Sequence, residues 1–211
     1  MMRRRRPARQ TALAVGLGAI TWTAAEYGLH RFLMHEMKGK GLASKEHLKH
    51  HANVTYFSPA SKKAASAAGA TAIVLPATWA TTGPDTAIGY TSGVIGMYLV
   101  YEWVHRRIHT HPARTPHGRF IRRQHLEHHA GSPMRNFGVT TAVFDRAFGT
   151  FDPTTTVTLP RRIAPVWMLD ADDEVRPELR AEYVVRGTRR MDPAQAERDR
   201  VAAFANEAPE L

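Results

Sequence analysis

A chain of 211 residues has room for one domain of ordinary size and a tail. It contains no cysteine, which excludes disulfide frameworks, thiolate metal sites and a cysteine nucleophile. The 29 Lys and Arg residues outnumber the 19 Asp and Glu residues, and this excess of positive charge favours an anionic partner, either a nucleic acid or a lipid surface. Residues 1–151 hold 20 of the basic residues and 7 of the acidic ones, so the basic character belongs to the first part of the chain.

Three uncharged apolar segments indicate membrane helices. They cover residues 10–25, 64–84 and 86–101. A membrane-spanning helix needs about 20 largely apolar residues, so the second segment is long enough, and the other two are if they extend to about His30 and His105. Their Gly, Ala and Thr residues suit close helix packing in lipid. We therefore predict an all-α integral membrane bundle of three to four helices, and buried helices of a soluble protein are the alternative.

The expected topology follows from a short turn and from the basic residues. Gly83-Pro84-Asp85 predicts a hairpin between the last two apolar segments, so the chain enters and leaves this hairpin on one side of the membrane. The segment 30–63 carries seven basic residues, which assigns that side to the cytoplasm. The arginine-rich start of the chain would prefer the same side, but a single crossing by residues 10–25 would not allow it. The first segment therefore lies in the membrane interface, re-enters without crossing, or is a cleaved signal peptide.

The C-terminal part differs from the rest because prolines recur there and acidic residues outnumber basic ones. We predict that residues 1–151 form the membrane-embedded domain and that residues 152–211 form a cytoplasmic tail. Asp192 followed by Pro193 is typical of a helix start, and we expect a short helix that ends near Asn206.

All twelve histidines lie within residues 30–51 and 105–129. Each of these windows contains a pair followed by a triplet, and the ten residues concerned are His30 and His35, His47, His50 and His51, His105 and His109, and His125, His128 and His129. Residues three and four apart share a helix face, so each triplet projects its imidazoles together. Ten convergent imidazoles exceed the four ligands of a tetrahedral zinc site and predict two metal ions. Because His30 and His35 are five apart, we expect a helix end or a distortion between them.

A histidine ligand needs a partner for its second ring nitrogen, and nearby carboxylates are the candidates. These carboxylates are Glu26, Glu46, Glu102, Glu127 and Asp145. The other two histidines, His111 and His117, fall outside the pattern, and we interpret them as solvated loop residues. Imidazole suits iron, zinc, copper and nickel alike, so the ligands alone do not name the metal.

The histidine motifs resemble the boxes of the fatty acid hydroxylase/sterol desaturase superfamily, and they read HRFLMH (30–35), HLKHH (47–51), HRRIH (105–109) and HLEHH (125–129). The segment 136–151 also resembles the segment that follows the last box there. The resemblance implies an O2-dependent, non-haem di-iron centre that the ten box histidines hold, with zinc as an alternative in isolated protein. It implies hydroxylation or desaturation of an unactivated C–H of a lipid, such as a fatty acyl chain or a sterol-like substrate. The centre would face the cytoplasm from a plasma membrane of bacterial type.

The substrate and the partners stay open at this level. VHRR (104–107) is also similar to bacterial carotenoid hydroxylases, which makes a carotenoid ring the alternative substrate. Oxidation of an alkyl chain needs a cofactor, and no flavin, haem or nucleotide motif is present, so we expect a separate electron donor of the ferredoxin, cytochrome or reductase type. A basic cytoplasmic face would suit such a donor or anionic head groups, and a plain solvated rim is the alternative. The residues of this face would be Arg106, Arg107, Arg119, Arg122 and Arg123.

Two hypotheses from other classes compete with the enzyme. A membrane metal carrier or sensor would use the histidines for transport, but the two later apolar segments carry no ionisable residue along a span. A basic nucleic-acid binder needs basic or aromatic stripes on soluble elements. Here the basic residues alternate with the histidines beside apolar segments, so we expect a lipid substrate and no nucleic acid.

Overall fold

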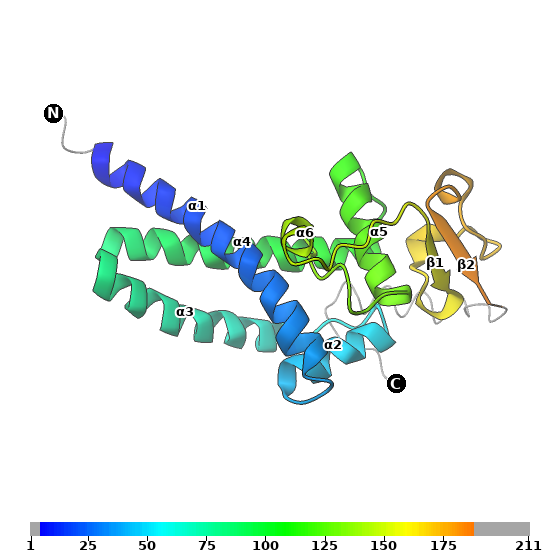
Figure 1. Cartoon of the computed structure of the whole chain (residues 1–211), viewed down its shortest axis with the longest axis horizontal. Helices are drawn as coiled ribbons and strands as arrows, with labels where there is room; N and C mark the ends of the chain where they lie inside the picture. Colours follow the sequence, from blue (N-terminus) through cyan, green and yellow to red (C-terminus); the bar gives the residue numbers. More distant parts are fainter. Residues whose placement is uncertain (1–4, 188–211) are drawn as a thin grey trace. The chain divides into compact units, whose positions relative to one another are not determined.

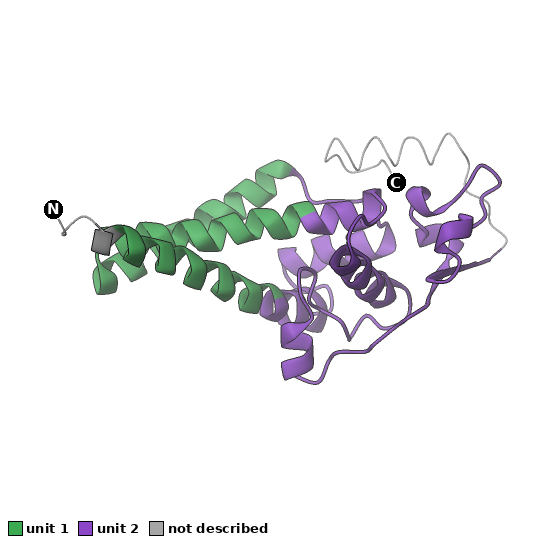
Figure 2. Ribbon diagram, turned by 90° about the horizontal axis from the view of Figure 1, so that it is seen from above, with its two compact units in different colours: residues 1–26, 60–103 green, residues 27–59, 104–211 purple. Residues whose placement is uncertain are grey.

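The computed structural model describes residues 5–187, and within them helices predominate (Figure 1). The helices are α1 (Arg5–Gly28), α2 (Leu42–Ala52), α3 (Ala60–Thr82), α4 (Pro84–Thr110), α5 (Pro116–Ala130) and α6 (Val143–Ala147), with a π-helix, η1 (Leu29–Glu36), directly after α1. The chain divides into two compact units (Figure 2). Unit 1 comprises residues 1–26 and 60–103, and unit 2 comprises residues 27–59 and 104–211. The predicted helix at 192–206 lies outside the described residues.

In unit 1, helices α1 and α4 approach each other closely at glycines. A methyl group on Gly93 would lie 2.0 Å from the carbonyl oxygen of Val15, and one on Gly18 would lie 2.1 Å from that of Tyr90. No side chain fits in either place, so each glycine allows the two backbones to touch. The hydroxyl of Tyr90 also donates a hydrogen bond to the hydroxyl of Thr21 (2.9 Å), which joins the same two helices.

The hairpin between α3 and α4 is confirmed. Helix α3 ends at Thr82, and Gly83 has a φ of 82°, in the left-handed region that favours glycine. Pro84 is the first residue of α4, a position where its missing N–H would have no partner in any helix. No residue of α3 is buried, and Ile73 is 72% exposed.

None of the helices in residues 5–187 combines the length and the apolarity that a membrane crossing needs. The bundle of three to four membrane helices therefore stays a prediction.

Unit 2 contains the histidine-bearing helices and a small sheet. Thr115 caps α5, because its hydroxyl accepts a hydrogen bond from the backbone N–H of Gly118 (3.0 Å). Strands β1 (Val157–Pro160) and β2 (Tyr183–Arg186) pair in parallel, and β1 packs against α5. Short 3₁₀ turns lie between the strands: η2 (Arg161–Ile163), η3 (Val166–Met168) and η4 (Pro177–Leu179). Fully buried apolar side chains of this unit are Leu126, Phe137, Val139, Val157, Leu159 and Met168.

The two strands correct the all-α expectation. In β1 the buried side chains of Val157 and Leu159 alternate with the exposed side chain of Thr158, which is the period of a strand. Four residues are too few for this alternation to stand out in the sequence. The partner strand follows more than 20 residues later, so no hairpin turn marks the pair either.

The glycine contact between α1 and α4 can be tested with one added methyl group. We expect Gly93→Ala to lower the free energy of unfolding by about 1–3 kcal/mol, because the helices must separate to admit the methyl group. Gly96→Ala is the control in the same helix. Nothing lies within 4 Å of its added methyl, and alanine favours the helix, so no loss is expected. Thermal unfolding followed by circular dichroism gives both values, and equal effects of the two substitutions would contradict the packing described.

Candidate metal centre

The structure brings together all ten histidines of the four boxes in unit 2. They form two sets of five, and within each set the ligand nitrogens all lie within 4.8 Å of one another. The first set, centre A, consists of His30, His35, His47, His51 and His128. The second set, centre B, consists of His50, His105, His109, His125 and His129. His111 and His117 belong to neither centre.

Each centre includes one histidine from the other sequence window, and we call these two the exchanged histidines. Centre A takes four residues from the first window and His128 from the second, whereas centre B takes four from the second window and His50 from the first. Both exchanged residues are the middle histidine of an HxxHH triplet. In a helix the first and third histidines of such a triplet are four residues apart and about 40° around the axis, and the middle one lies about 100° from the third. The middle imidazole therefore turns toward the neighbouring centre.

The π-helix accounts for the spacing of the first pair. In η1 the backbone hydrogen bonds run from residue i to i+5, so residues five apart come onto one face. The rings of His30 and His35 consequently face the same centre, with their centroids 5.1 Å apart. The distortion expected between these two residues is confirmed, and it is a π-helix rather than a helix end.

The nitrogen positions fit bound cations and do not fit a hydrogen-bond network. Within each centre, neighbouring Nε2 atoms are 2.9–3.1 Å apart. The single atom His47 Nε2 has three such neighbours, on His30, His35 and His51. A neutral imidazole Nε2 carries either one hydrogen or one lone pair and cannot make three hydrogen bonds. Lone pairs that converge on one ion explain the arrangement, because ligands about 2.1 Å from a metal and about 90° apart are about 3.0 Å from each other.

Backbone carbonyls hold the second ring nitrogen of three ligands. His50 Nδ1 donates to the carbonyl of Tyr56 (2.7 Å), His128 Nδ1 donates to that of Arg135 (2.7 Å), and His30 Nδ1 donates to that of Phe137. A carbonyl can only accept, so Nδ1 carries the hydrogen and Nε2 keeps its lone pair for a metal. These partners could not be predicted from the residue types, because every residue has a carbonyl.

A residue with a left-handed backbone conformation, Asn136, lies between two of these carbonyls. Asn136 has a φ of 55°, a conformation that asparagine tolerates better than most residues, and it stands between Arg135 and Phe137. Its side-chain amide is fixed by Asp152, whose backbone N–H donates to Asn136 Oδ1 and whose carbonyl accepts from Asn136 Nδ2, both at 2.9 Å. The carbonyls on either side of Asn136 therefore reach two histidines of centre A.

Two of the predicted carboxylates contact the residues whose carbonyls hold the histidines, rather than the histidines themselves. Buried Asp145 accepts hydrogen bonds from the backbone N–H groups of Phe137 (2.8 Å) and Gly138 (2.7 Å), and so fixes the segment whose carbonyl holds His30. Glu46 accepts a hydrogen bond from the hydroxyl of Tyr56, whose carbonyl holds His50. One carboxylate thus supports the loop beside each centre.

The other predicted carboxylates lie elsewhere. Glu26 and Glu102 belong to unit 1, where Glu26 is buried and Glu102 forms an ion pair with Lys63 (2.6 Å). Glu127 lies on α5, and burial raises the pKa of its carboxyl group. A direct role of these three as histidine partners stays a prediction.

Burial keeps the imidazoles neutral. Loss of solvent lowers the pKa of His30 to about 3, that of His35 to about 4 and that of His51 to about 2. The pKa values of His47 and His128 are well below the ordinary value for the same reason, and neighbouring imidazoles lower them further. At neutral pH these rings are uncharged, so each has one nitrogen with a free lone pair.

The structure thus defines a mainly helical protein with two buried five-histidine clusters. The sequence profile of the fatty acid hydroxylase family matches residues 15–150, and the chain belongs to this family.

Relatives of known function agree with this assignment. A dihydroceramide fatty acyl 2-hydroxylase of Arabidopsis thaliana, FAH2, is 30% identical over 145 residues, which are 67% of this chain and 61% of the relative. A ceramide very long chain fatty acid hydroxylase of Saccharomyces cerevisiae, SCS7, is 29% identical over 150 residues, 64% of this chain and 37% of the relative. A solved structure, full-length scs7p with only the hydroxylase domain visible, matches with a TM-score of 0.57 and 26% identity, over 68% of this chain and 56% of that one. The chain therefore spans less than two thirds of these relatives.

The division into two centres predicts which histidine pairs share a metal. His47→Ala with His51→Ala removes two ligands from centre A, and we expect this variant to retain about one of two metals per chain. His50→Ala with His51→Ala changes neighbouring residues of the same box but removes one ligand from each centre, so both metals should bind more weakly. The loss should be at least the roughly 10- to 100-fold that removal of an outer-shell partner causes. Elemental analysis after dialysis against a graded chelator series measures this. Identical titration curves for the two variants would refute the assignment of ligands.

The lowered pKa values predict a stability that falls on acidification. Below pH 6.5 the unfolded chain binds protons on histidines that stay neutral in the folded chain, so stability rises with pH up to about 6.5 and is level above it. Each such histidine contributes up to about 1.4 kcal/mol per pH unit. Urea unfolding of the metal-free protein between pH 5.5 and 7.5 measures the slope. A stability that increases on acidification would contradict the burial of neutral rings.

Proposed function

We propose that the chain is an O2-dependent hydroxylase that acts on an unactivated C–H of a fatty acyl chain in a membrane lipid. The observation that carries the proposal is the pair of buried five-imidazole centres in a member of the fatty acid hydroxylase family. The names of the two relatives supply the substrate class. One is a dihydroceramide fatty acyl 2-hydroxylase and the other is a ceramide very long chain fatty acid hydroxylase.

The balanced reaction defines what the protein needs. One C–H bond becomes C–OH, and the second oxygen atom of O2 leaves as water after it takes up two electrons and two protons. When bound, a pair of iron ions would activate O2 and supply the oxidant that side chains cannot provide. We propose iron over zinc because this step transfers electrons and zinc has no redox chemistry. The two electrons must come from a separate donor of the ferredoxin, cytochrome or reductase type.

The residues around the centres would hold the metals and keep water away. His125 and His128 are completely buried, and the neutral rings offer lone pairs without first losing a proton. One phenylalanine packs on each centre. The ring centroid of Phe137 lies 5.6 Å from that of His128 in centre A, and the ring centroid of Phe57 lies 5.3 Å from that of His50 in centre B. These apolar rings would shield the centres and leave room only for an apolar chain.

We also propose that unit 1 lies in or against a membrane, with the histidines on the cytoplasmic side. Large apolar side chains on all three of its helices are more than half exposed: Leu13, Leu17, Ile20, Ile73, Leu99 and Trp103. Exposed apolar surface of this extent marks an interaction site. A lipid surface would cover it and would also deliver the acyl substrate.

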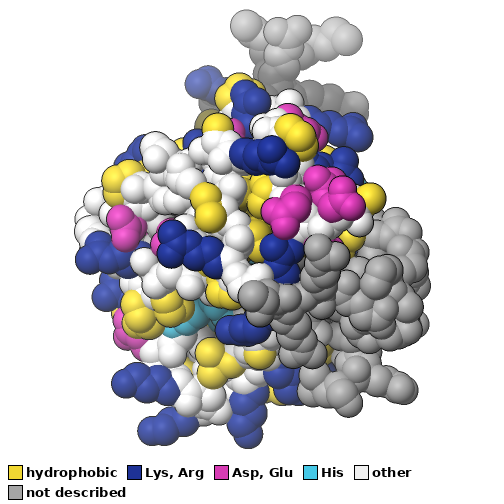
Figure 3. Space-filling view, turned by 90° about the vertical axis from the view of Figure 1, so that its right-hand side faces the viewer, with side chains coloured by type: hydrophobic (Ala, Val, Ile, Leu, Met, Phe, Trp, Pro, Cys, Tyr) yellow, Lys and Arg dark blue, Asp and Glu magenta, His cyan; other side chains and the backbone are white. Residues whose placement is uncertain are grey.

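The electron donor would dock on a basic surface. On the face of the molecule in Figure 3, Lys and Arg side chains are spread widely, and histidine is visible only in one small area. Arg106 belongs to unit 2, and its guanidinium lies 4.7 Å from the ring centroid of Phe57 beside centre B. An acidic donor protein would be attracted to such a surface.

Lipid profiling of cells with and without the chain tests the proposal. The intact chain should produce lipids that have gained one oxygen atom on an acyl chain, found together with the protein in the membrane fraction. His128→Ala should abolish this product, because it removes a ligand of centre A, and His117→Ala should retain it, because His117 belongs to neither centre. A loss of two hydrogens, a change confined to carotenoids, or an unchanged lipid profile would each overturn the proposal.

A further inference from the structure

A cavity of about 270 Å³ lies in unit 2, apart from both histidine centres. It is lined by residues of α5, of the loop after α4 and of the segment from η3 to β2. Its lining contains no histidine among the described residues, but it contains three arginines, two glutamates and two aromatic rings. The arginines, one of the glutamates and both aromatic residues are Arg119, Arg122, Arg176, Glu178, Trp167 and Tyr183. This volume is close to the lower end of the range for small-molecule pockets, about 300–1,000 Å³.

Arg122 was expected on a basic surface, but the structure buries it, with 4% of the residue exposed. Two of its nitrogens have partners at the end of α4, since Nε donates to the carbonyl of Ile108 (3.2 Å) and Nη2 donates to that of Arg107 (2.9 Å). The guanidinium carbon lies 4.9 Å from the ring centroid of Trp167. The third nitrogen, Nη1, is buried and has no hydrogen-bond partner within residues 5–187. Burial lowers the pKa of Arg122 to about 10, so the side chain still carries its positive charge at neutral pH.

An unpartnered charged donor beside a cavity calls for an acceptor. A buried charged donor that lacks an acceptor destabilises the folded chain. The helix-capping role of Arg122 explains Nε and Nη2 but does not explain Nη1. The indole N–H of Trp167, on another lining residue, is likewise buried and has no partner among the described residues. Two donors at one cavity therefore lack acceptors.

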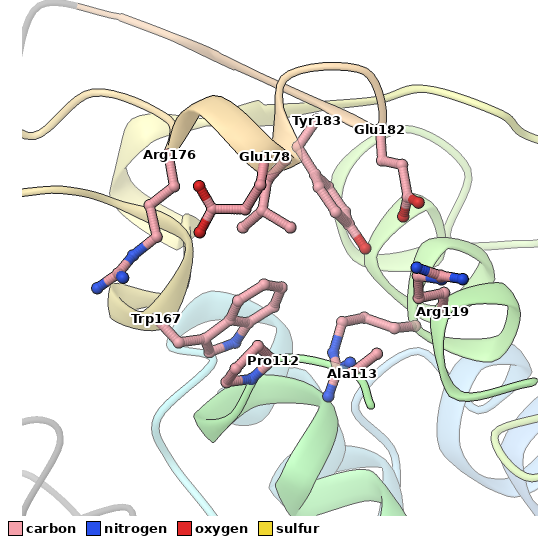
Figure 4. Close-up of a pocket in the computed structure, with 10 residues that line it drawn as sticks. Pro112, Ala113, Arg119, Trp167, Arg176, Glu178, Glu182 and Tyr183 are labelled. Carbon is pink, nitrogen blue, oxygen red and sulfur yellow. The ribbon is translucent and has the colours of Figure 1, made fainter. Parts of the chain in front are cut away.

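The charges divide the cavity into two sides (Figure 4). The hydroxyl of Tyr183 lies on the same side as Arg119 and Glu182, and Glu178 lies on the opposite side, near Arg176. The Glu182 carboxylate is already engaged, because Arg123 Nη1 donates to it at 2.9 Å. Burial raises the pKa of Tyr183 to about 12, so its hydroxyl remains a donor at neutral pH. The side that carries Arg119 is thus rich in donors and has its one carboxylate neutralised.

We propose that this cavity is an anion site, which binds a phosphate group through Arg119, Arg122 and Tyr183. Guanidinium groups present parallel N–H donors that match the oxygens of a phosphate. Trp167 would form an apolar wall beside the anion. The phosphate could belong to a small solute or to the head group of an anionic phospholipid, and both offer the same oxygens to the site. The inference does not depend on the proposed hydroxylase activity.

Calorimetric titration of the full chain with inorganic phosphate tests the site. The unmodified chain should show saturable binding, and Arg119→Gln should weaken it at least about tenfold, because one charged donor is lost. Arg162→Gln is the matched control: Arg162 is exposed, lies in the adjoining η2 turn and does not line the cavity. Arg122 itself is unsuitable for substitution because it also caps α4. Tyr183→Phe provides a second cavity variant and should weaken binding without a change of charge.

A second arm identifies the source of the phosphate. The same variants are titrated with detergent micelles that contain phosphatidic acid or, for comparison, phosphatidylcholine. Tighter binding of phosphatidic acid than of inorganic phosphate, lost in Arg119→Gln, would assign the site to a lipid head group, and the reverse order would assign it to a solute. Absence of saturable binding in both arms would overturn the proposal. Equal weakening by Arg119→Gln and Arg162→Gln would overturn it as well, because it would indicate nonspecific attraction to a basic chain.

Discussion

Ten imidazoles can be buried together only if they stay uncharged and direct their lone pairs inward, and most of unit 2 serves this requirement. Desolvation suppresses protonation, so the rings do not repel one another at neutral pH. The orientation of three of the rings then depends on what the second ring nitrogen contacts. Carbonyls of Tyr56, Arg135 and Phe137 fix three rings, and buried polar groups fix those carbonyls in turn. The loops beside the centres are therefore part of the candidate metal site, because they orient the histidines.

The exchange of His50 and His128 makes the two centres dependent on each other. Each HxxHH helix contributes to both centres, so α2 and α5 cannot separate without breaking both. The rings of His51 and His129 stack between the centres with centroids 4.0 Å apart, which adds a direct contact. The parallel between the halves extends outward: a carboxylate supports the carbonyl that holds His30 in one half and the carbonyl that holds His50 in the other. We infer that the pair of centres folds as one cooperative element.

Much of the site could be predicted from sequence because it depends on the spacing of histidines within single helices. The spacing of His47, His50 and His51 defines a helix face, and the distortion between His30 and His35 follows from a spacing that a regular helix does not accommodate. The distribution of ligands between the centres could not be predicted, since it depends on how α2 and α5 face each other. Carbonyl partners leave no sequence signal, and the four-residue strands are too short for their alternation to be noticed. The burial of Arg122 was missed because an arginine in a basic segment resembles a surface residue.

The central claim is that the ten imidazoles hold two metal ions, five to each. Anomalous X-ray diffraction from crystals of the iron-loaded chain, recorded on both sides of the iron absorption edge, tests it most directly. We expect two iron peaks, one surrounded by the ligand nitrogens of centre A and the other by those of centre B. A single peak shared by both sets, or iron bound away from the histidines, would contradict it.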